Sequence, residues 1–286
     1  MNARRMSPLR QLAAQLQLGL AGLFVLVPVL WLVRLAFDAR LDSRPDDAAL
    51  WPSAWTGAHI ADAWRAPRAG VSFARLLSNS LIVSGGTAAL ALLFGVSAAY
   101  AFARFRFRGR RLVLLATLVL LATPPAGLMA PYYIWFNGLG IRQTLLALIL
   151  VYSAIAVPFA LWTVRIAVQN VPREIEEAAM LEGAATRTVF WRVTLPLVAP
   201  SVATAGFIGF ALAWSEFALG WVFVSDPQRV TLAMALYSMR GESGVSWGLL
   251  AATTLLMVLP VLALFYLLGR YVIQGLSLGA ARLDDD

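Results

Sequence analysis

Long apolar stretches alternate with shorter polar segments along almost the whole chain. A helix that spans a bilayer needs about 20 mostly apolar residues, and six stretches reach that length. Only helices or closed barrels satisfy every backbone polar group inside lipid. The pattern therefore predicts an all-α polytopic membrane protein with six transmembrane helices. The predicted spans are Leu16–Phe37, Leu76–Ala103, Leu112–Tyr132, Thr144–Val164, Ser201–Phe223 and Ser246–Arg270.

The spans divide the chain into an N-terminal segment (1–15), a membrane domain (16–270) and a C-terminal tail (271–286). Pro124 and Pro125 interrupt the far half of the third span. Proline inside a span is tolerated where neighbouring helices or a cavity satisfy the freed carbonyl groups. We therefore expect a break in this helix.

The composition supports a membrane protein and excludes several kinds of site. Hydrophobic residues make up 60% of the chain and charged residues 13%, whereas soluble domains are about half apolar and a quarter charged. There is no cysteine, and the single histidine, His59, cannot form a metal cluster. All basic residues are Arg, and a phosphate-binding P-loop needs a Lys. We therefore expect no catalytic or metal site in this chain, and if its function uses ATP, another subunit would have to bind it.

The arginines indicate the orientation of the spans. Cytoplasmic loops of membrane proteins are enriched in basic residues, and the densest cluster is Arg104–Arg111, between the second and third spans. A nucleic-acid site there is disfavoured because both flanks enter the membrane. The loop Asp38–Asp62 is more acidic. We expect both termini on the cytoplasmic side, with the first apolar stretch as an uncleaved anchor.

A helix-forming segment interrupts the apolar pattern between the fourth and fifth spans. Asn170 and Pro172 suit a helix start, and Gly183 suits its end. A second short helix follows, with Thr186 as its expected cap and Pro196 at its end. A hairpin on the lipid surface would have a broad apolar face with basic flanks. The first helix is instead acidic and rich in alanine, which favours docking to a protein.

The spacing of this segment resembles the cytoplasmic signature of ABC importer permeases: Glu-Ala-Ala, three residues, Gly, nine residues, Ile, one residue, Leu-Pro. Valine stands at the isoleucine position. The resemblance implies a type I importer permease fold with cytoplasmic coupling helices (residues 170–196) that seat in a nucleotide-binding subunit. It also implies that ATP and Mg bind that subunit and that this chain binds no cofactor. The matching residues are Glu177, Ala178, Ala179, Gly183, Val193, Leu195 and Pro196.

Further motifs resemble the six-span permeases of the maltose-type carbohydrate-uptake family. That resemblance implies a bacterial cytoplasmic membrane location, a second homologous permease, two ATPase subunits and an extracytoplasmic binding protein that delivers a sugar or oligosaccharide. The loops Asp38–Arg75 and Phe223–Val245 would then face the binding protein, and the Gly275–Arg282 stretch would reach the ATPases. The motifs are Asn79–Ser84, Ala99–Arg110, Phe136–Leu150, Val157–Trp162, Ala213–Phe217 and Gly275–Arg282.

Glu216 lies deep in the fifth predicted span, beside Trp214 and Ser215. A carboxylate in a membrane is costly unless it faces a cavity or a partner. One interpretation is that these three residues line a substrate pathway, although the family has Asn where Ser215 stands. The other is that Glu216 makes a buried hydrogen bond that holds helices together. The residues alone leave both open.

Three other functions remain to be compared with a sugar importer. An ABC permease for amino acids or peptides shares the cytoplasmic signature. A secondary transporter or channel would use Glu216 for protons or ions and work without ATP. A membrane enzyme is disfavoured because the spans hold no paired carboxylates, Cys or Lys.

Overall fold

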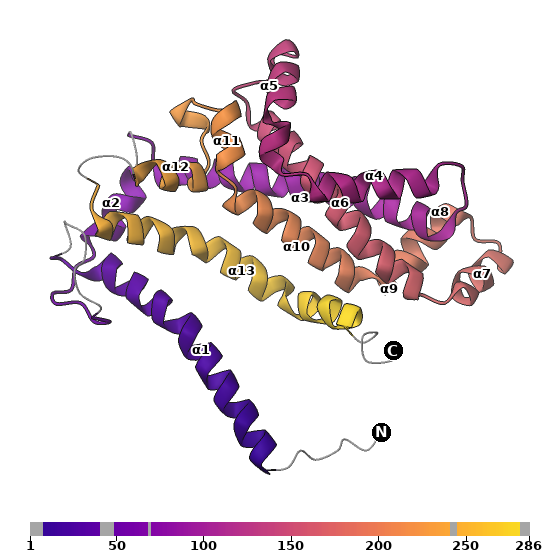
Figure 1. The fold of residues 1–286 in the computed structure, drawn as a ribbon, viewed down its shortest axis with the longest axis horizontal. Helices are drawn as coiled ribbons and strands as arrows, with labels where there is room; N and C mark the ends of the chain where they lie inside the picture. The colour runs from indigo at the N-terminus through magenta and orange to yellow at the C-terminus, as the bar shows by residue number, and fades with distance from the viewer. Residues whose placement is uncertain (1–7, 41–48, 68–69, 241–244, 281–286) are drawn as a thin grey trace. The chain divides into compact units, whose positions relative to one another are not determined.

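The computed structural model describes residues 8–40, 49–67, 70–240 and 245–280, and these residues are almost entirely helical (Figure 1). Within them no strand forms, and an isolated bridge pairs Asp38 with Trp55. The predictions for residues 1–7 and 281–286 of the termini, and for parts of both loops assigned to the binding protein, lie outside the described residues. Helices long and apolar enough to cross a membrane are α1 (Pro8–Phe37), α3 (Phe73–Arg104), α6 (Leu145–Asn170) and α13 (Trp247–Ala280).

Two further apolar helices are bent, and counting each bent pair as one span raises the number in the described residues from four to six. The first pair joins α4 (Arg110–Ala122) to η1 (Pro125–Leu128) and α5 (Met129–Gly138) at 106°. This confirms the expected break at Pro124 and Pro125.

The second bent pair joins Thr186–Leu197 to Ala199–Ser215 at 79°. The fifth predicted span has a further break near its far end, where none was expected. It consists of α10 (Ala199–Ser215) and α11 (Ala218–Phe223). Glu216 between them has an extended backbone, with φ −76° and ψ 133°. The sixth predicted span is longer than expected, because α13 continues past Arg270 to Ala280.

The chain divides into two compact units. The smaller unit comprises Met1–Ser72 and Ser238–Met257, with α1, α2 (Ala58–Arg65) and the start of α13. Its core contains Leu35, Ala36, Ala63, Ala251 and Ala252.

Asp38 is a buried carboxylate in the smaller unit, just after α1. Burial raises the pKa of a carboxyl group, but backbone N–H groups of Ser53 and Arg40 and the charge of Arg34 outweigh it and lower the pKa of Asp38. Its carboxylate lies 3.6 Å from Arg34 and accepts a hydrogen bond of 2.9 Å from the Ser53 hydroxyl. The polar cluster therefore ties Arg40 and Ser53 to the end of α1.

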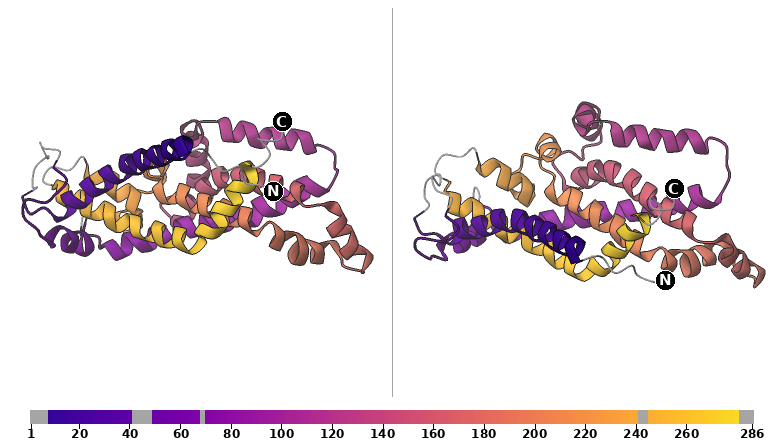
Figure 2. Two further views of the ribbon diagram at one scale, coloured as in Figure 1. Left: turned by 90° about the horizontal axis from the view of Figure 1, so that it is seen from below. Right: turned by 60° about the horizontal axis from the view of Figure 1, so that its bottom comes forward.

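The larger unit comprises Phe73–Tyr237 and Val258–Asp286, and its centre is formed by α3, α6 and α10, which lie side by side (Figures 1 and 2). Glycines allow the close approach. A Cβ added to Gly95 of α3 would lie 2.6 Å from Ala160 Cβ of α6, and one added to Gly86 would lie 2.8 Å from the Ile149 side chain. Small residues at helix contacts are the usual means of close packing in membranes.

Candidate functional site

The segment that joins α6 to α10 forms the predicted pair of short helices. The first, α7, covers Arg173–Leu181. The expected cap at Asn170 is wrong, because α6 continues through Asn170 and Pro172 occupies the N-cap position of α7. Gly183 has φ +91°, in the left-handed region that glycine adopts at helix ends. The prediction that Gly183 ends the first helix is confirmed.

The second short helix is continuous in direction but irregular in hydrogen bonding. It consists of α8 (Thr186–Val189), a π-helical turn η2 (Phe190–Thr194) and α9 (Leu195–Leu197). Ala185, rather than the expected Thr186, occupies its N-cap position. The helix also passes Pro196 and bends by 79° at Val198 into α10. Proline has no N–H and clashes with the preceding turn of an α-helix, and the wider π turn accommodates it.

The coupling segment, defined here as residues 170–196, presents an exposed surface of mixed character. Leu181 is 90% exposed and Trp191 is 55% exposed, while Glu177, Ala178 and Gly183 are exposed around them. Both views in Figure 2 show these short helices projecting at one end of the larger unit. Large apolar side chains at such a protrusion, beside an acidic helix, are typical of a protein interface.

Glu176, immediately before the signature, is buried, and sequence reasoning missed its role. Its Oε2 lies 2.8 Å from Arg104 Nε at the end of α3, and its Oε1 accepts a 2.6 Å hydrogen bond from the Thr194 hydroxyl. Arg104 also donates to the Val171 carbonyl oxygen at 2.8 Å. The sequence pattern indicated Arg104 only as one of the basic residues that mark a cytoplasmic loop. In the structure, Arg104 also attaches both short helices to α3. No local pattern in the sequence points to this pair, because Arg104 and Glu176 lie far apart along the chain.

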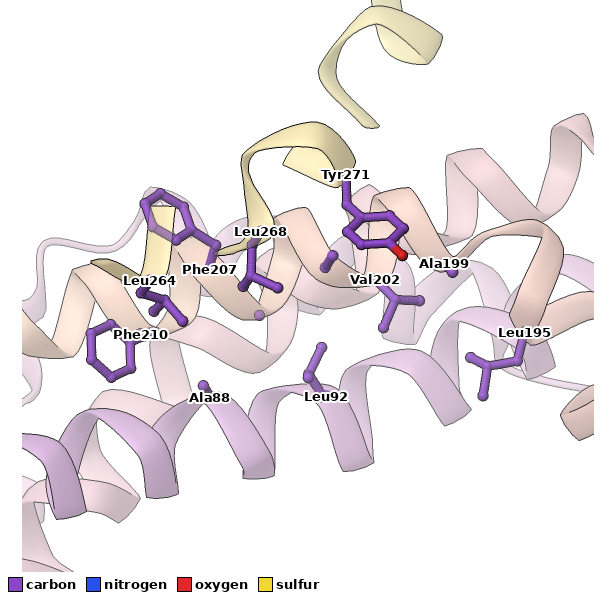
Figure 3. Close-up of a pocket in the computed structure, with 12 residues that line it drawn as sticks. Ala88, Leu92, Leu195, Ala199, Val202, Phe207, Phe210, Leu264, Leu268 and Tyr271 are labelled. Atoms are coloured by element: carbon purple, nitrogen blue, oxygen red, sulfur yellow. The ribbon is translucent and has the colours of Figure 1, made fainter. Parts of the chain in front are cut away.

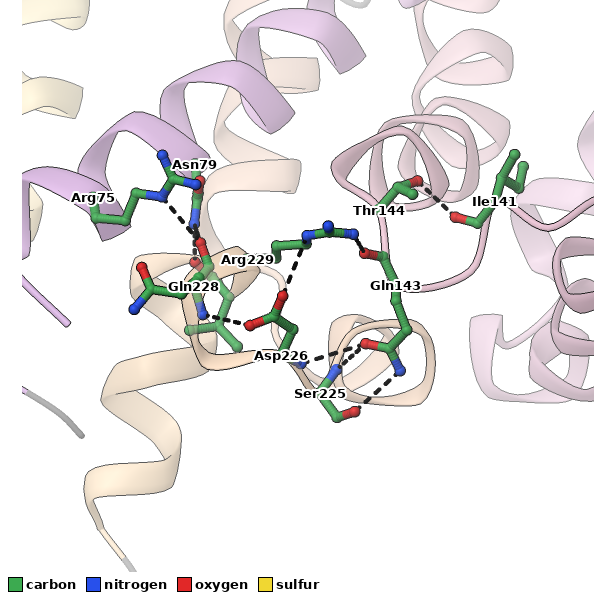
Figure 4. Close-up of polar contacts among 10 residues, drawn as sticks. Arg75, Asn79, Ile141, Gln143, Thr144, Ser225, Asp226, Gln228 and Arg229 are labelled. Carbon is green, nitrogen blue, oxygen red and sulfur yellow. Dashed lines mark hydrogen bonds and ion pairs between the residues drawn. The ribbon is translucent and has the colours of Figure 1, made fainter. Parts of the chain in front are cut away.

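A polar cluster joins the connections at the opposite end of the larger unit (Figure 4). Gln143, between α5 and α6, has φ +64°. Its Oε1 accepts a 2.8 Å hydrogen bond from Ser225 N–H, and its carbonyl oxygen accepts one from Arg229. Arg229 also pairs with Asp226 at 3.3 Å. The cluster holds the α5–α6 connection against η3 (Pro227–Arg229).

The Asn79 amide, on the first turns of α3, is buried beside that cluster. Its Nδ2 donates to the carbonyl oxygens of Gln228 and Val230, each at 2.9 Å. The Ser80 hydroxyl accepts a 2.7 Å hydrogen bond from Leu232 N–H at the start of α12 (Leu232–Met239). Residues 228–232 are thereby fixed to α3.

Glu216 occupies the break between α10 and α11. Its carboxylate accepts hydrogen bonds from Leu219 N–H at 2.9 Å and Gly220 N–H at 3.3 Å, on the first turn of α11. Trp214 is buried and stacks on Phe210, with centroids 5.4 Å apart. Ser215 is exposed and Glu216 half-buried. Both oxygens of the Glu216 carboxylate therefore accept hydrogen bonds from the start of α11.

A cavity of about 500 Å³ lies within the larger unit, between α3, α10 and the later part of α13 (Figure 3). Its walls are almost wholly apolar and include Phe207, Phe210 and Tyr271. A sugar needs several hydrogen-bonding partners, so this cavity suits hydrocarbon better than a carbohydrate. Among the described residues, no group of three or more potential metal ligands is present.

The family of the chain follows from comparison with known proteins. Residues 91–278, which include the coupling segment and the Glu216 break, match the family model described as the binding-protein-dependent transport system inner membrane component. The chain belongs to this family. This confirms the family resemblance that the sequence motifs indicated.

Relatives and a solved structure agree with this assignment. The chain is 31% identical to the diacetylchitobiose uptake system permease protein DasC of Streptomyces coelicolor, over 89% of this chain and 91% of the relative. It is 30% identical to the trehalose transport system permease protein SugB of Mycobacterium tuberculosis, over 91% and 93%. A bacterial ABC transporter involved in alginate import matches in structure with a TM-score of 0.75 and 18% identity, over 94% of this chain and 98% of the other. The expected importer-permease fold is confirmed.

Proposed function

We propose that this chain is one transmembrane subunit of an ATP-driven importer that forms half of the translocation pathway for a sugar or oligosaccharide. Family membership supports binding-protein-dependent transport. The two relatives named above are permeases of diacetylchitobiose and trehalose uptake systems, which favours a sugar over an amino acid or peptide. The single observation that carries the proposal is the protruding coupling segment with its exposed apolar side chains.

The coupling segment is the docking site for a separate ATPase subunit. Leu181 and Trp191 supply the apolar area, and Glu177 supplies a charge at the rim. The position of Gly183 is uncrowded within this chain, since nothing lies within 4 Å of a Cβ added there. The full assembly has a second permease, two ATPases that bind ATP and Mg, and an extracytoplasmic binding protein. In the proposed assembly, the coupling segment and both termini face the cytoplasm.

Transport follows from rigid contact between the subunits. ATP binding closes the ATPase pair, and the coupling segment moves with it. The packed helices α3, α6 and α10 then tilt, and the pathway changes from inward-open to outward-open, a rigid-body transition of a familiar kind. ATP hydrolysis returns the complex to its first state.

The substrate pathway runs past the break in the fifth span. The exposed Ser215 and the half-buried Glu216 carboxylate offer acceptors for sugar hydroxyl groups. The stacked rings of Phe217 and Tyr237, with centroids 4.2 Å apart, offer an aromatic face beside them, and Tyr237 is 50% exposed. Trp214 supports this region from within, through its stack on Phe210.

Affinity purification of the tagged chain from its native membrane in mild detergent tests the proposal. We expect a Walker-type ATPase and a second permease to co-purify, both identified by mass spectrometry. The reconstituted assembly should take up labelled diacetylchitobiose, trehalose or a related sugar only with ATP. A chain recovered alone, stable and monodisperse, and transporting without ATP would instead support a secondary transporter centred on Glu216.

A further inference from the structure

Helix α3 is fastened by polar side chains at both of its ends. At its C-terminal end, Arg104 binds Glu176 and the Val171 carbonyl oxygen, and Glu176 also accepts from Thr194. The side chains of Arg104 and Glu176 are only 8% and 6% exposed. An ion pair so well shielded from water, with its remaining acceptor filled by a hydroxyl group, holds a defined geometry.

At its N-terminal end, α3 is fastened to the segment that follows α11. Asn79 donates to Gln228 and Val230, and Ser80 accepts from Leu232. Asn79 and Ser80 are 2% and 1% exposed. Arg75 adds a hydrogen bond of 3.2 Å to the Gln228 carbonyl oxygen (Figure 4). These contacts lie at the opposite end of the helix from the coupling segment.

The whole of α3, which includes both fastenings, is an uninterrupted helix of 32 residues without proline. At a rise of 1.5 Å per residue it is about 48 Å long. Gly86 and Gly95 bring it into close contact with α6. Close-packed interiors deform little and transmit strain. The chain connections link the coupling segment to α6 and α10. Its contacts with α3 are made by the Arg104 cluster and by Phe190, whose ring packs on Tyr100 with centroids 4.9 Å apart.

We propose that α3 acts as a rigid rod, a helix that moves as one body and transmits the movement of the coupling segment to residues 225–232 at its other end. The positioning residues at the C-terminal end of α3 are Arg104, Glu176 and Thr194. Those at its N-terminal end are Asn79 and Ser80. The proposal rests on the function proposed above, because it assumes that an ATPase moves the coupling segment. A buried ion pair adds little net stability over an apolar replacement, so its value here lies in fixing geometry.

A labelling experiment on the complete importer tests the rod. The chain has no cysteine, so Gln228→Cys provides a unique reporter in this subunit. The side chain of Gln228 is exposed, and the hydrogen bonds from Asn79 and Arg75 go to its carbonyl oxygen. The complex, with ATPases bound, is labelled by a charged, membrane-impermeant maleimide, either without nucleotide or after trapping with ATP and vanadate. The labelled permease is then separated on a gel and its rate measured.

In the reporter background we expect the two states to differ in labelling rate by about five-fold or more, the range of a typical coupling free energy. Glu176→Gln and Asn79→Ala should each reduce this difference strongly while vanadate trapping of the ATPase persists. The two changes together should have no greater effect than either alone, because they lie on one path. Thr194→Val, which keeps the ion pair, should reduce the difference partially.

Matched controls are Ser78→Ala, at a half-buried position of α3, and Ser97→Ala, at an exposed one. The two hydroxyl groups donate to the Arg75 and Leu93 carbonyl oxygens within the helix. Both should retain the full difference. The rod is contradicted if Glu176→Gln and Asn79→Ala retain it with intact trapping, or if the reporter shows no difference before either change. Failure of the ATPase to co-purify with the unaltered chain would contradict the proposed function instead.

Discussion

The central helices and the coupling segment use the same kinds of residue for different purposes. In the centre, Gly95 makes room for α6. In the coupling segment, Gly183 has open space around it, and the position favours glycine because its φ is +91°. The neighbouring glutamates differ likewise, since Glu176 is buried against Arg104 and Glu177 is exposed. The centre satisfies its own contacts, whereas the coupling segment leaves groups for a partner.

Breaking the buried ion pair should have the largest effect on stability. Arg104→Leu leaves the Glu176 charge buried without a partner, which costs about 3–5 kcal/mol. The double change Arg104→Leu with Glu176→Leu should cost much less than the single one. Thermal unfolding in detergent of the wild type, both single variants and the double variant measures this cycle. Equal and additive losses would show that the pair is not energetically coupled.

Filling the space at Gly95 should have the next largest effect. Gly95→Ala places a Cβ 2.6 Å from Ala160 Cβ, and such overpacking costs about 1–3 kcal/mol. Gly85→Ala on the same helix meets nothing within 4 Å and should stabilise by about 0.5–1 kcal/mol. Opposite shifts of the melting temperature are expected. Similar shifts in both variants would argue against close α3–α6 contact.

Gly183→Ala should have a smaller effect on folding and a larger one on transport. The left-handed backbone costs a residue with a Cβ about 1–2 kcal/mol, and Gly183→Asn should cost less because asparagine tolerates this region. Uptake and ATP hydrolysis are measured in the assembled importer. We expect the ratio of sugar transported to ATP hydrolysed to fall in Gly183→Ala and to recover in Gly183→Asn. Unchanged ratios would exclude a strict conformational requirement.

Glu177→Gln should have the smallest effect on stability, within about 0.5 kcal/mol, because surface positions without special contacts are tolerant. Its effect should appear in the partner. We expect weaker retention of the ATPase during salt washes of the purified complex than in Glu182→Gln, a second exposed position on the same segment. Equal retention would place Glu177 outside the interface.

The sequence predicted the spans and the coupling helices because apolar length and Pro/Gly positions are local signals. The breaks at Pro124 and Gly183 follow from single residues in the same way. The break at Glu216 did not follow, since a carboxylate inside an apolar stretch does not reveal that it caps the next turn. The partner of Glu176 was missed for a related reason, because Arg104 lies far away in sequence and only packing brings the two together.

Cross-linking from the coupling segment tests the central claim most directly. In this cysteine-free chain, Leu181→Cys carries a thiol-specific photo-cross-linker at a 90% exposed position. Leu139→Cys, at a 69% exposed position beyond α5, is the control. We predict that illumination of the native-membrane complex joins Leu181→Cys, and not Leu139→Cys, to an ATPase subunit. Capture of the ATPase from Leu139→Cys alone, or from neither position, would contradict the assignment of residues 170–196 as the coupling site.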